Sequence, residues 1–205
     1  MSEAAIIEFP QDGRPSDISP EEWQARCDLA ACYRLVDHYA WSDLFGTHIS
    51  LRVPGTDHFL LNPYGMLFGE ITASSLVKVD QDGNMLTESE YPINPAGFTI
   101  HSAVHMSSHE MNAVLHTHTR AGNAVACMKE GLLPYHQKAL TLLGFVGYHD
   151  YESVALDHDD LSALADRLTC LIQSKERFSF GVDWCVRGVD IFPGLDAVFA
   201  WLTRL

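Results

Sequence analysis

The sequence predicts a single α/β domain, and three observations lead to this fold class. Its 205 residues match the size of one ordinary domain. Hydrophobic residues make up 47% and charged residues 20% of the chain, a composition that can bury a core and argues against disorder. Segments with the periodicity of helices alternate with short segments that have the periodicity of strands.

The N-terminal part is predicted to be a flexible lead-in followed by a helix. Residues 1–18 contain prolines and glycine and no regular pattern. Ser19 is a favourable N-cap, Pro20 suits the first helical turn, and two acidic residues follow at the positive end of the helix dipole. An apolar stripe then predicts a helix that continues to about Asp37.

Three strands are predicted next. Residues 48–53 alternate between apolar and polar side chains, and residues 58–61 form a second extended segment. The Pro-Gly-Thr-Asp sequence at 54–57 is typical of a turn, so the two segments predict a hairpin. Residues 76–79 predict a further strand.

The second half of the chain predicts helices around one buried strand. A helix is expected over residues 94–108, followed by a strand over 112–115 that leads into a His-Thr-His motif. Thr119 is a favourable cap for a helix that extends to about residue 128, and residues 155–173 show a later helical period. The last thirty residues give no clear pattern.

Charge and cysteine usage restrict the partners and the compartment. The formal net charge of −14 disfavours nucleic-acid binding, which needs a basic surface. No leader and no long apolar segment is evident, so neither secretion nor a membrane span is expected. The five cysteines are scattered and form no Cys-x-x-Cys pair, which favours reduced thiols in a cytoplasmic protein.

Two histidines are the strongest chemical signal. Side chains alternate along a strand, so His116 and His118 are expected to share one face, with Thr117 opposite. Zinc binds neutral imidazole and usually takes three protein ligands in catalytic sites. Alone, the pair is explained as simply by two hydrogen-bonded polar residues at a strand end. Three further histidines strengthen the metal hypothesis: His101, His105 and His149.

Further motifs occur in a fixed order between Arg26 and Glu152. They are the segments 46–52, 59–65, 70–78, 94–103, 114–119, 131–134 and 147–152. In sequence and spacing they resemble the class II aldolase/adducin family, and its adducin-type branch in particular.

The resemblance implies a fold, an assembly and a cofactor. The fold is a three-layer α/β/α domain over residues 19–205 with a mostly antiparallel sheet, often assembled as a homo-oligomer such as a tetramer. Family enzymes bind a divalent metal, most commonly Zn²⁺, through three histidines, of which the first two correspond to His116 and His118. The metal acts as a Lewis acid on a small carbonyl or sugar-phosphate substrate. The loops that hold this substrate correspond to positions near Thr47, His48, Tyr64 and Gly65.

The chain departs from the family pattern at two positions. Gly97 stands where the sugar-phosphate enzymes have a catalytic Glu, so proton transfer would fall to another group. His101 is the first candidate, with His105 and Glu152 as further options. The resemblance implies a third metal ligand on a late strand, where Arg187 is found instead. The site would then keep two histidines, use His149 as the third ligand, or bind metal weakly. Residues 169–205 are interpreted as diverged, truncated or altered.

Two functions therefore remain open at the level of sequence. One is a metal-dependent aldolase or lyase that acts on a small carbonyl or sugar-phosphate compound. The other is a non-catalytic adducin-like structural or interaction domain, favoured by Gly97 and by the missing late histidine. A passive metal-binding protein is the third option. Tightly bound metal would favour the enzyme.

Overall fold

The computed structural model of the chain describes residues 13–107, 109, 111–143, 146–149, 179–183 and 187–192. The first twelve residues of the predicted lead-in, Glu152 and the predicted helix over 155–173 lie outside this part. Across the described residues, no helix is both long enough and apolar enough to cross a membrane.

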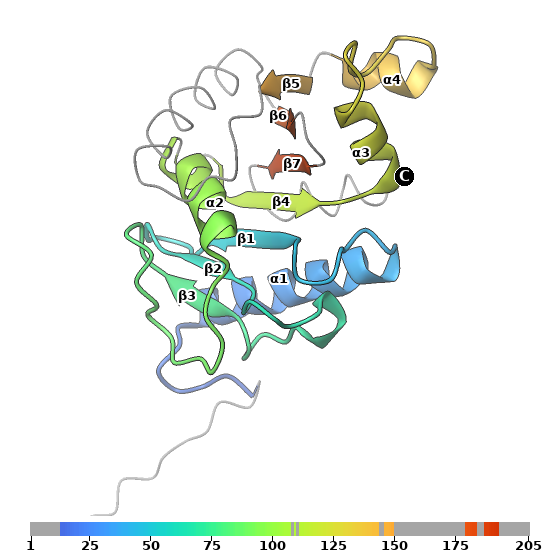
Figure 1. Ribbon diagram of the computed structural model, residues 1–205. Helices are drawn as coiled ribbons and strands as arrows, with labels where there is room; N and C mark the ends of the chain where they lie inside the picture. Colours follow the sequence, from blue (N-terminus) through green and yellow to red (C-terminus); the bar gives the residue numbers. More distant parts are fainter. Residues whose placement is uncertain are drawn as a thin grey trace, which may run out of the picture.

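One sheet organises the fold (Figure 1). Its seven strands are arranged in the order β3-β2-β1-β4-β7-β6-β5, and all neighbours are antiparallel except β5 and β6. The elements are α1 (Pro20–His38), β1 (His48–Arg52), β2 (Phe59–Leu61), the 3-10 helix η1 (Phe68–Glu70), β3 (Val77–Val79), α2 (Pro95–Ser107), β4 (Ala113–Thr117), α3 (Arg120–Ala126), α4 (Gln137–Leu142), β5 (Val146–His149), β6 (Ser179–Asp183) and β7 (Arg187–Phe192).

The helix starts follow the predicted capping. The Ser19 hydroxyl accepts a hydrogen bond from the Glu22 backbone N–H at 3.1 Å, and the Thr119 hydroxyl accepts one from Gly122 at 3.0 Å. Each bond satisfies a backbone donor that the first turn of a helix leaves without an intrahelical acceptor. The predicted helices and strands between residues 19 and 128 are confirmed, including the hairpin of β1 and β2. η1, α4, β5, β6 and β7 were not predicted.

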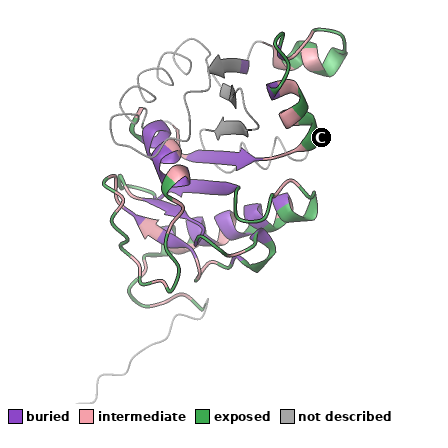
Figure 2. Cartoon of the chain, in the orientation of Figure 1, coloured by how far each residue is buried: buried purple, intermediate pink, exposed green. Residues whose placement is uncertain are grey.

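Strands β1, β2 and β4 are buried on both faces (Figure 2). Ile49 and Leu115 belong to a core cluster with Leu29 and Tyr33 of α1, so α1 covers one face. The alternate side chains of β1 and β4 point to the other face, which α2 covers. The arrangement is the three-layer α/β/α fold that the sequence predicted, and the face under α2 carries His48 and His116.

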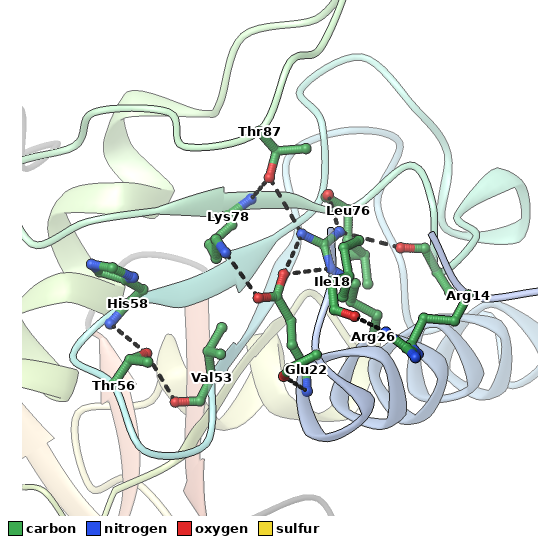
Figure 3. A network of polar contacts seen from close by, with 12 residues as sticks. Arg14, Ile18, Glu22, Arg26, Val53, Thr56, His58, Leu76, Lys78 and Thr87 are labelled. Carbon is green, nitrogen blue, oxygen red and sulfur yellow. Dashed lines mark hydrogen bonds and ion pairs between the residues drawn. The ribbon is translucent and has the colours of Figure 1, made fainter. Parts of the chain in front are cut away.

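A buried charged network joins α1 to β3 on the α1 side of the sheet (Figure 3). Glu22 accepts hydrogen bonds from Arg26 at 2.9 Å and from Lys78 at 2.8 Å, and Arg26 also donates to the Leu76 carbonyl at 2.7 Å. Burial alone would raise the pKa of Glu22, but the two cations outweigh it and lower this pKa. The network fixes the edge strand against the first helix.

Candidate metal and catalytic site

The His-Thr-His motif forms a close imidazole pair. His116 lies in β4 and His118 follows its last residue, and their Nε2 atoms are 2.9 Å apart. The two side chains therefore share one region, as the alternation along the strand predicted. Two nitrogens bound to one tetrahedral zinc lie roughly 3.3 Å apart, given Zn–N bonds of about 2.0–2.1 Å. The observed 2.9 Å is the length of a hydrogen bond between the two rings, and an ion bound by both would need the nitrogens to move apart by about 0.4 Å.

Asp43 orients one member of this pair. Its Oδ2 atom accepts a hydrogen bond from Nδ1 of His118 at 2.8 Å. In the neutral imidazole this bond places the hydrogen on Nδ1 and leaves Nε2 as the electron-pair donor. Metal-binding histidines are commonly oriented by a carboxylate in this way. Asp43 could not be identified from the sequence, because only the fold brings residue 43 to residue 118.

The described residues do not supply a third ligand. Within them, no group of three or more His, Cys, Asp or Glu side chains is placed to hold a metal ion. The late strand β7 pairs with β4, and its residues Gly188 and Val189 lie opposite Thr117 and His116. Arg187, the first residue of β7, precedes this pairing. His149 ends β5, and three strand spacings of about 4.8 Å place its backbone roughly 14 Å from β4.

His48 takes the space beside Gly97. It lies opposite His116 in the register of β1 and β4, and the two rings stack at 4.5 Å between centroids with an interplanar angle of 27°. A Cβ atom added to Gly97 would lie 2.8 Å from Cδ2 and 3.0 Å from Nε2 of His48. A side chain at position 97 and the His48 ring therefore exclude each other.

A chain of buried hydrogen bonds runs from His48 under α2. Nδ1 of His48 is 2.8 Å from Nε2 of His101, and Nδ1 of His101 is 2.7 Å from the Ser50 hydroxyl. This hydroxyl is also 2.7 Å from Nε2 of His105, whose Nδ1 donates to the Met111 carbonyl at 3.1 Å. Both ring nitrogens of His101 are thus engaged inside the protein, and its side chain is fully buried.

The interior keeps these imidazoles neutral. Burial, followed by the repulsion of the neighbouring imidazoles, holds the pKa of His101 well below its usual range. Burial lowers the pKa of His105 to about 3, although its hydrogen bond to Met111 opposes the shift. His101, the predicted acid/base candidate, is thus held neutral, and it is enclosed between His48 and Ser50.

The predicted substrate loops divide into two groups. Thr47 is buried next to His48, and its hydroxyl accepts a hydrogen bond from the Asp43 backbone N–H at 3.2 Å, which shapes the loop that carries Asp43. Tyr64 is exposed and meets Phe45 edge-to-face, with ring centroids 5.5 Å apart. Gly65 follows it with a φ of +107°, a conformation that favours glycine.

The fold and the imidazole pair define a protein of the class II aldolase type, and comparison with known proteins agrees. The family model "Class II Aldolase and Adducin N-terminal domain" matches residues 27–181. The chain belongs to this family.

Relatives come from both the aldolase and the adducin side of the family. A Pseudomonas aeruginosa protein with the name "Putative aldolase class 2 protein" is 56% identical over 160 residues, which are 78% of this chain and 61% of that protein. Mouse alpha-adducin is 46% identical over 138 residues, which are 66% of this chain and 19% of the adducin. The chain thus spans about three fifths of the bacterial relative and one fifth of the adducin.

Solved structures share the fold. An aldolase II superfamily protein from Pseudomonas syringae superposes with a TM-score of 0.79 at 40% identity, covering 92% of this chain and 75% of that one. L-fuculose 1-phosphate aldolase from Glaciozyma antarctica gives a TM-score of 0.73 at 22% identity, covering 93% and 73%. The second likeness concerns the fold alone.

Proposed function

We propose that the chain carries a metal-dependent aldolase-like site that acts on a small carbonyl or sugar-phosphate compound. His116 and His118 would hold a divalent metal, with zinc as the first candidate. A metal bound there would act as a Lewis acid that polarises the substrate carbonyl. The observation that carries this proposal is the pair of Nε2 atoms 2.9 Å apart, one of them oriented by Asp43.

The rest of the proposed site consists of the residues around this pair. His48 stacks on His116 and Thr47 holds the loop of Asp43, and both are proposed to contact the substrate, together with Tyr64 and Gly65. His149 was the sequence-based candidate for the third ligand. Because β7 and β6 separate its backbone from β4, we expect a His149→Ala variant to retain the metal.

Metal content tests the proposal directly. The protein purified without chelator should contain about one zinc, iron or manganese per chain by elemental analysis, following the one-ion catalytic sites of this type. The His116→Ala, His118→Ala double variant should lose it. His109→Ala, a change at an exposed histidine, is the matched control and should keep it. Metal-free wild type, even after zinc is added, would remove the proposal.

Activity should then depend on the bound metal. A screen of aldol-cleavage substrates would include L-fuculose 1-phosphate, the substrate in the name of a structural neighbour. We expect turnover in the metal-loaded wild type and none in the double variant.

A non-catalytic adducin-like role is the second candidate. It is supported by the 46% identity to mouse alpha-adducin and by Gly97, which supplies no proton-transferring group. This role predicts a folded protein that neither retains metal nor turns over any substrate in the same screen.

We also propose that the chain forms a homo-oligomer. Large apolar side chains near the site are exposed, namely Leu44, Phe45 and Tyr64. Such a patch is typical of an interaction surface. Light scattering on the purified protein should give a mass of at least twice the 22.8 kDa of one chain.

A further inference from the structure

We infer that the region from α3 through α4, residues 120–143, docks on the loop after β3, residues 80–91, of a second copy of this chain. The first region is called the basic arm below, and the second is called the acidic loop. The contact joins opposite charges around exposed apolar side chains. The inference rests on the proposed homo-oligomer and is independent of the metal site.

The basic arm is formed but has little cover from the rest of the described chain. None of the six residues of α4 is buried (Figure 2). A helix this short has little stability of its own, because isolated helices below about 12–15 residues are marginal in water. Large apolar side chains of the arm are exposed, by 40% for Met128, 86% for Tyr135 and 57% for Leu140. Such a surface is typical of an interaction site.

The acidic loop carries a similar set of exposed apolar side chains, namely Met85, Leu86 and Tyr91. Tyr91 joins this set to the exposed patch near the candidate site, since its Cδ1 atom lies 3.8 Å from the ideal Cβ position of Gly65, the residue after Tyr64. One chain therefore exposes two separate apolar surfaces.

The two surfaces carry opposite charges. Residues 80–91 contain no Lys, Arg or His and four acids, Asp80, Asp82, Glu88 and Glu90. Residues 120–143 have a net charge of +2 in a chain whose formal net charge is −14, because they contain one acid and three cations, all exposed: Glu130, Arg120, Lys129 and Lys138. Opposite charges around two apolar surfaces steer their association and select the partner. The acidic loop of another copy thus matches the arm in charge and in hydrophobic character.

The two surfaces lie too far apart to meet within one chain. α4 ends four residues before β5, at one edge of the sheet, whereas the acidic loop follows β3 at the opposite edge (Figure 1). Six strand spacings of about 4.8 Å separate these edges, which is roughly 29 Å. The arm of one copy therefore reaches the loop of another, either in a dimer with two such contacts or in a closed ring.

Both surfaces are ordered by hydrogen bonds of their own. In the acidic loop, the Asp80 carboxylate accepts hydrogen bonds from the backbone N–H groups of Asp82 and Asn84 at 3.0 and 2.8 Å. In the arm, Nδ1 of His136 accepts one from the Lys138 backbone N–H at 3.1 Å and so caps α4. Surfaces that are ordered before contact lose less conformational entropy on binding.

Exchanging the charges of the two surfaces tests the inference. In the full chain, Lys129→Glu, Lys138→Glu reverses the arm, and Glu88→Lys, Glu90→Lys reverses the loop. Light scattering over a dilution series should show that each double variant associates at least about tenfold more weakly than the wild type, because like charges then face each other. An equal mixture of the two double variants should regain the wild-type mass, since opposite charges again face each other at every contact. Arg34→Glu, a charge reversal at an exposed residue of α1, is the control and should associate like the wild type.

Each outcome decides the inference. Weaker association of both double variants that mixing restores would support it. Unchanged association in either double variant would overturn the inference and leave the homo-oligomer standing, and a loss that mixing does not restore would also overturn it. A wild-type mass of one chain, 22.8 kDa, would overturn both and leave the arm to a partner of another kind. The metal content of the same wild-type sample tests the proposed metal site separately.

Discussion

Two buried polar networks lie on opposite faces of the same sheet, and they differ in how their buried polar groups are stabilised. On the α1 side, Glu22 is enclosed by Arg26 and Lys78, so charges are retained and paired. On the α2 side, His101 and His105 stay neutral and are satisfied by a directed chain of hydrogen bonds. The paired charges fasten one helix to an edge strand. The neutral chain ends on a nitrogen next to the candidate site.

The largest effect is expected from breaking the charged network. Glu22→Ala would leave Arg26 and Lys78 without their buried carboxylate, and loss of one partner of a buried ion pair costs about 3–5 kcal/mol. Urea unfolding should show this loss in the free energy of unfolding. Glu21→Ala, one residue away on the exposed side, is the control and should cost less than about 1 kcal/mol. Equal effects would contradict the account of the network.

The stability that the neutral network contributes should depend on pH below about 6.5. The charged network should depend on pH only in a more acidic range, because the pKa of Glu22 is lowered from 4.5. The folded-state pKa values of His101 and His105 lie below the ordinary value of 6.5, so the unfolded chain binds more protons as pH falls. The contribution of both is complete well above pH 6.5 and decreases as the pH falls, and that of His105 is lost toward pH 3. Each imidazole should remove about 1.4 kcal/mol of unfolding free energy per pH unit in this window.

Unfolding measured from pH 7.5 to 5 checks this slope. A His105→Gln variant removes one of the two titrating groups, so its stability should fall less steeply with acid. The same steepness in both proteins would show that His105 does not carry the effect.

A smaller effect is expected from Gly97→Ala. Helix propensity alone would stabilise α2 by up to about 1 kcal/mol. The added Cβ would instead lie 2.8 Å from the His48 ring, and overpacking of this kind costs about 1–3 kcal/mol. In a His48→Ala background the same Gly97→Ala change should cost much less, because the ring that the Cβ atom would meet is gone. A double-mutant cycle measures this difference in the free energy of unfolding. Additive effects would mean that the two positions do not compete for space.

Local signals explain why much of the fold could be predicted from the sequence. Ser19 and Thr119 cap helices through bonds to residues three positions away, and this spacing is visible in the chain. The shared face of His116 and His118 follows from the two-residue period of a strand. The site pair could therefore be found without a structure.

The missing parts depend on contacts between distant residues. Asp43 meets His118 across 75 positions, and His48 meets His101 across 53, so no local pattern reveals either contact. β6, with the sequence Ser-Phe-Gly-Val-Asp, contains a glycine that weakens the strand signal. α4 has only six residues, too few for a helical period to stand out.

The most direct test of the central claim is the position of a metal in the folded protein. Crystals grown with zinc should give an anomalous-scattering peak bonded to Nε2 of both His116 and His118, with the Asp43 contact to His118 retained. A peak bonded to this pair would establish the site from which the proposed chemistry follows. Zinc bound only elsewhere, or no ordered zinc at the pair while both rings keep their positions, would contradict the account and favour the adducin-like role.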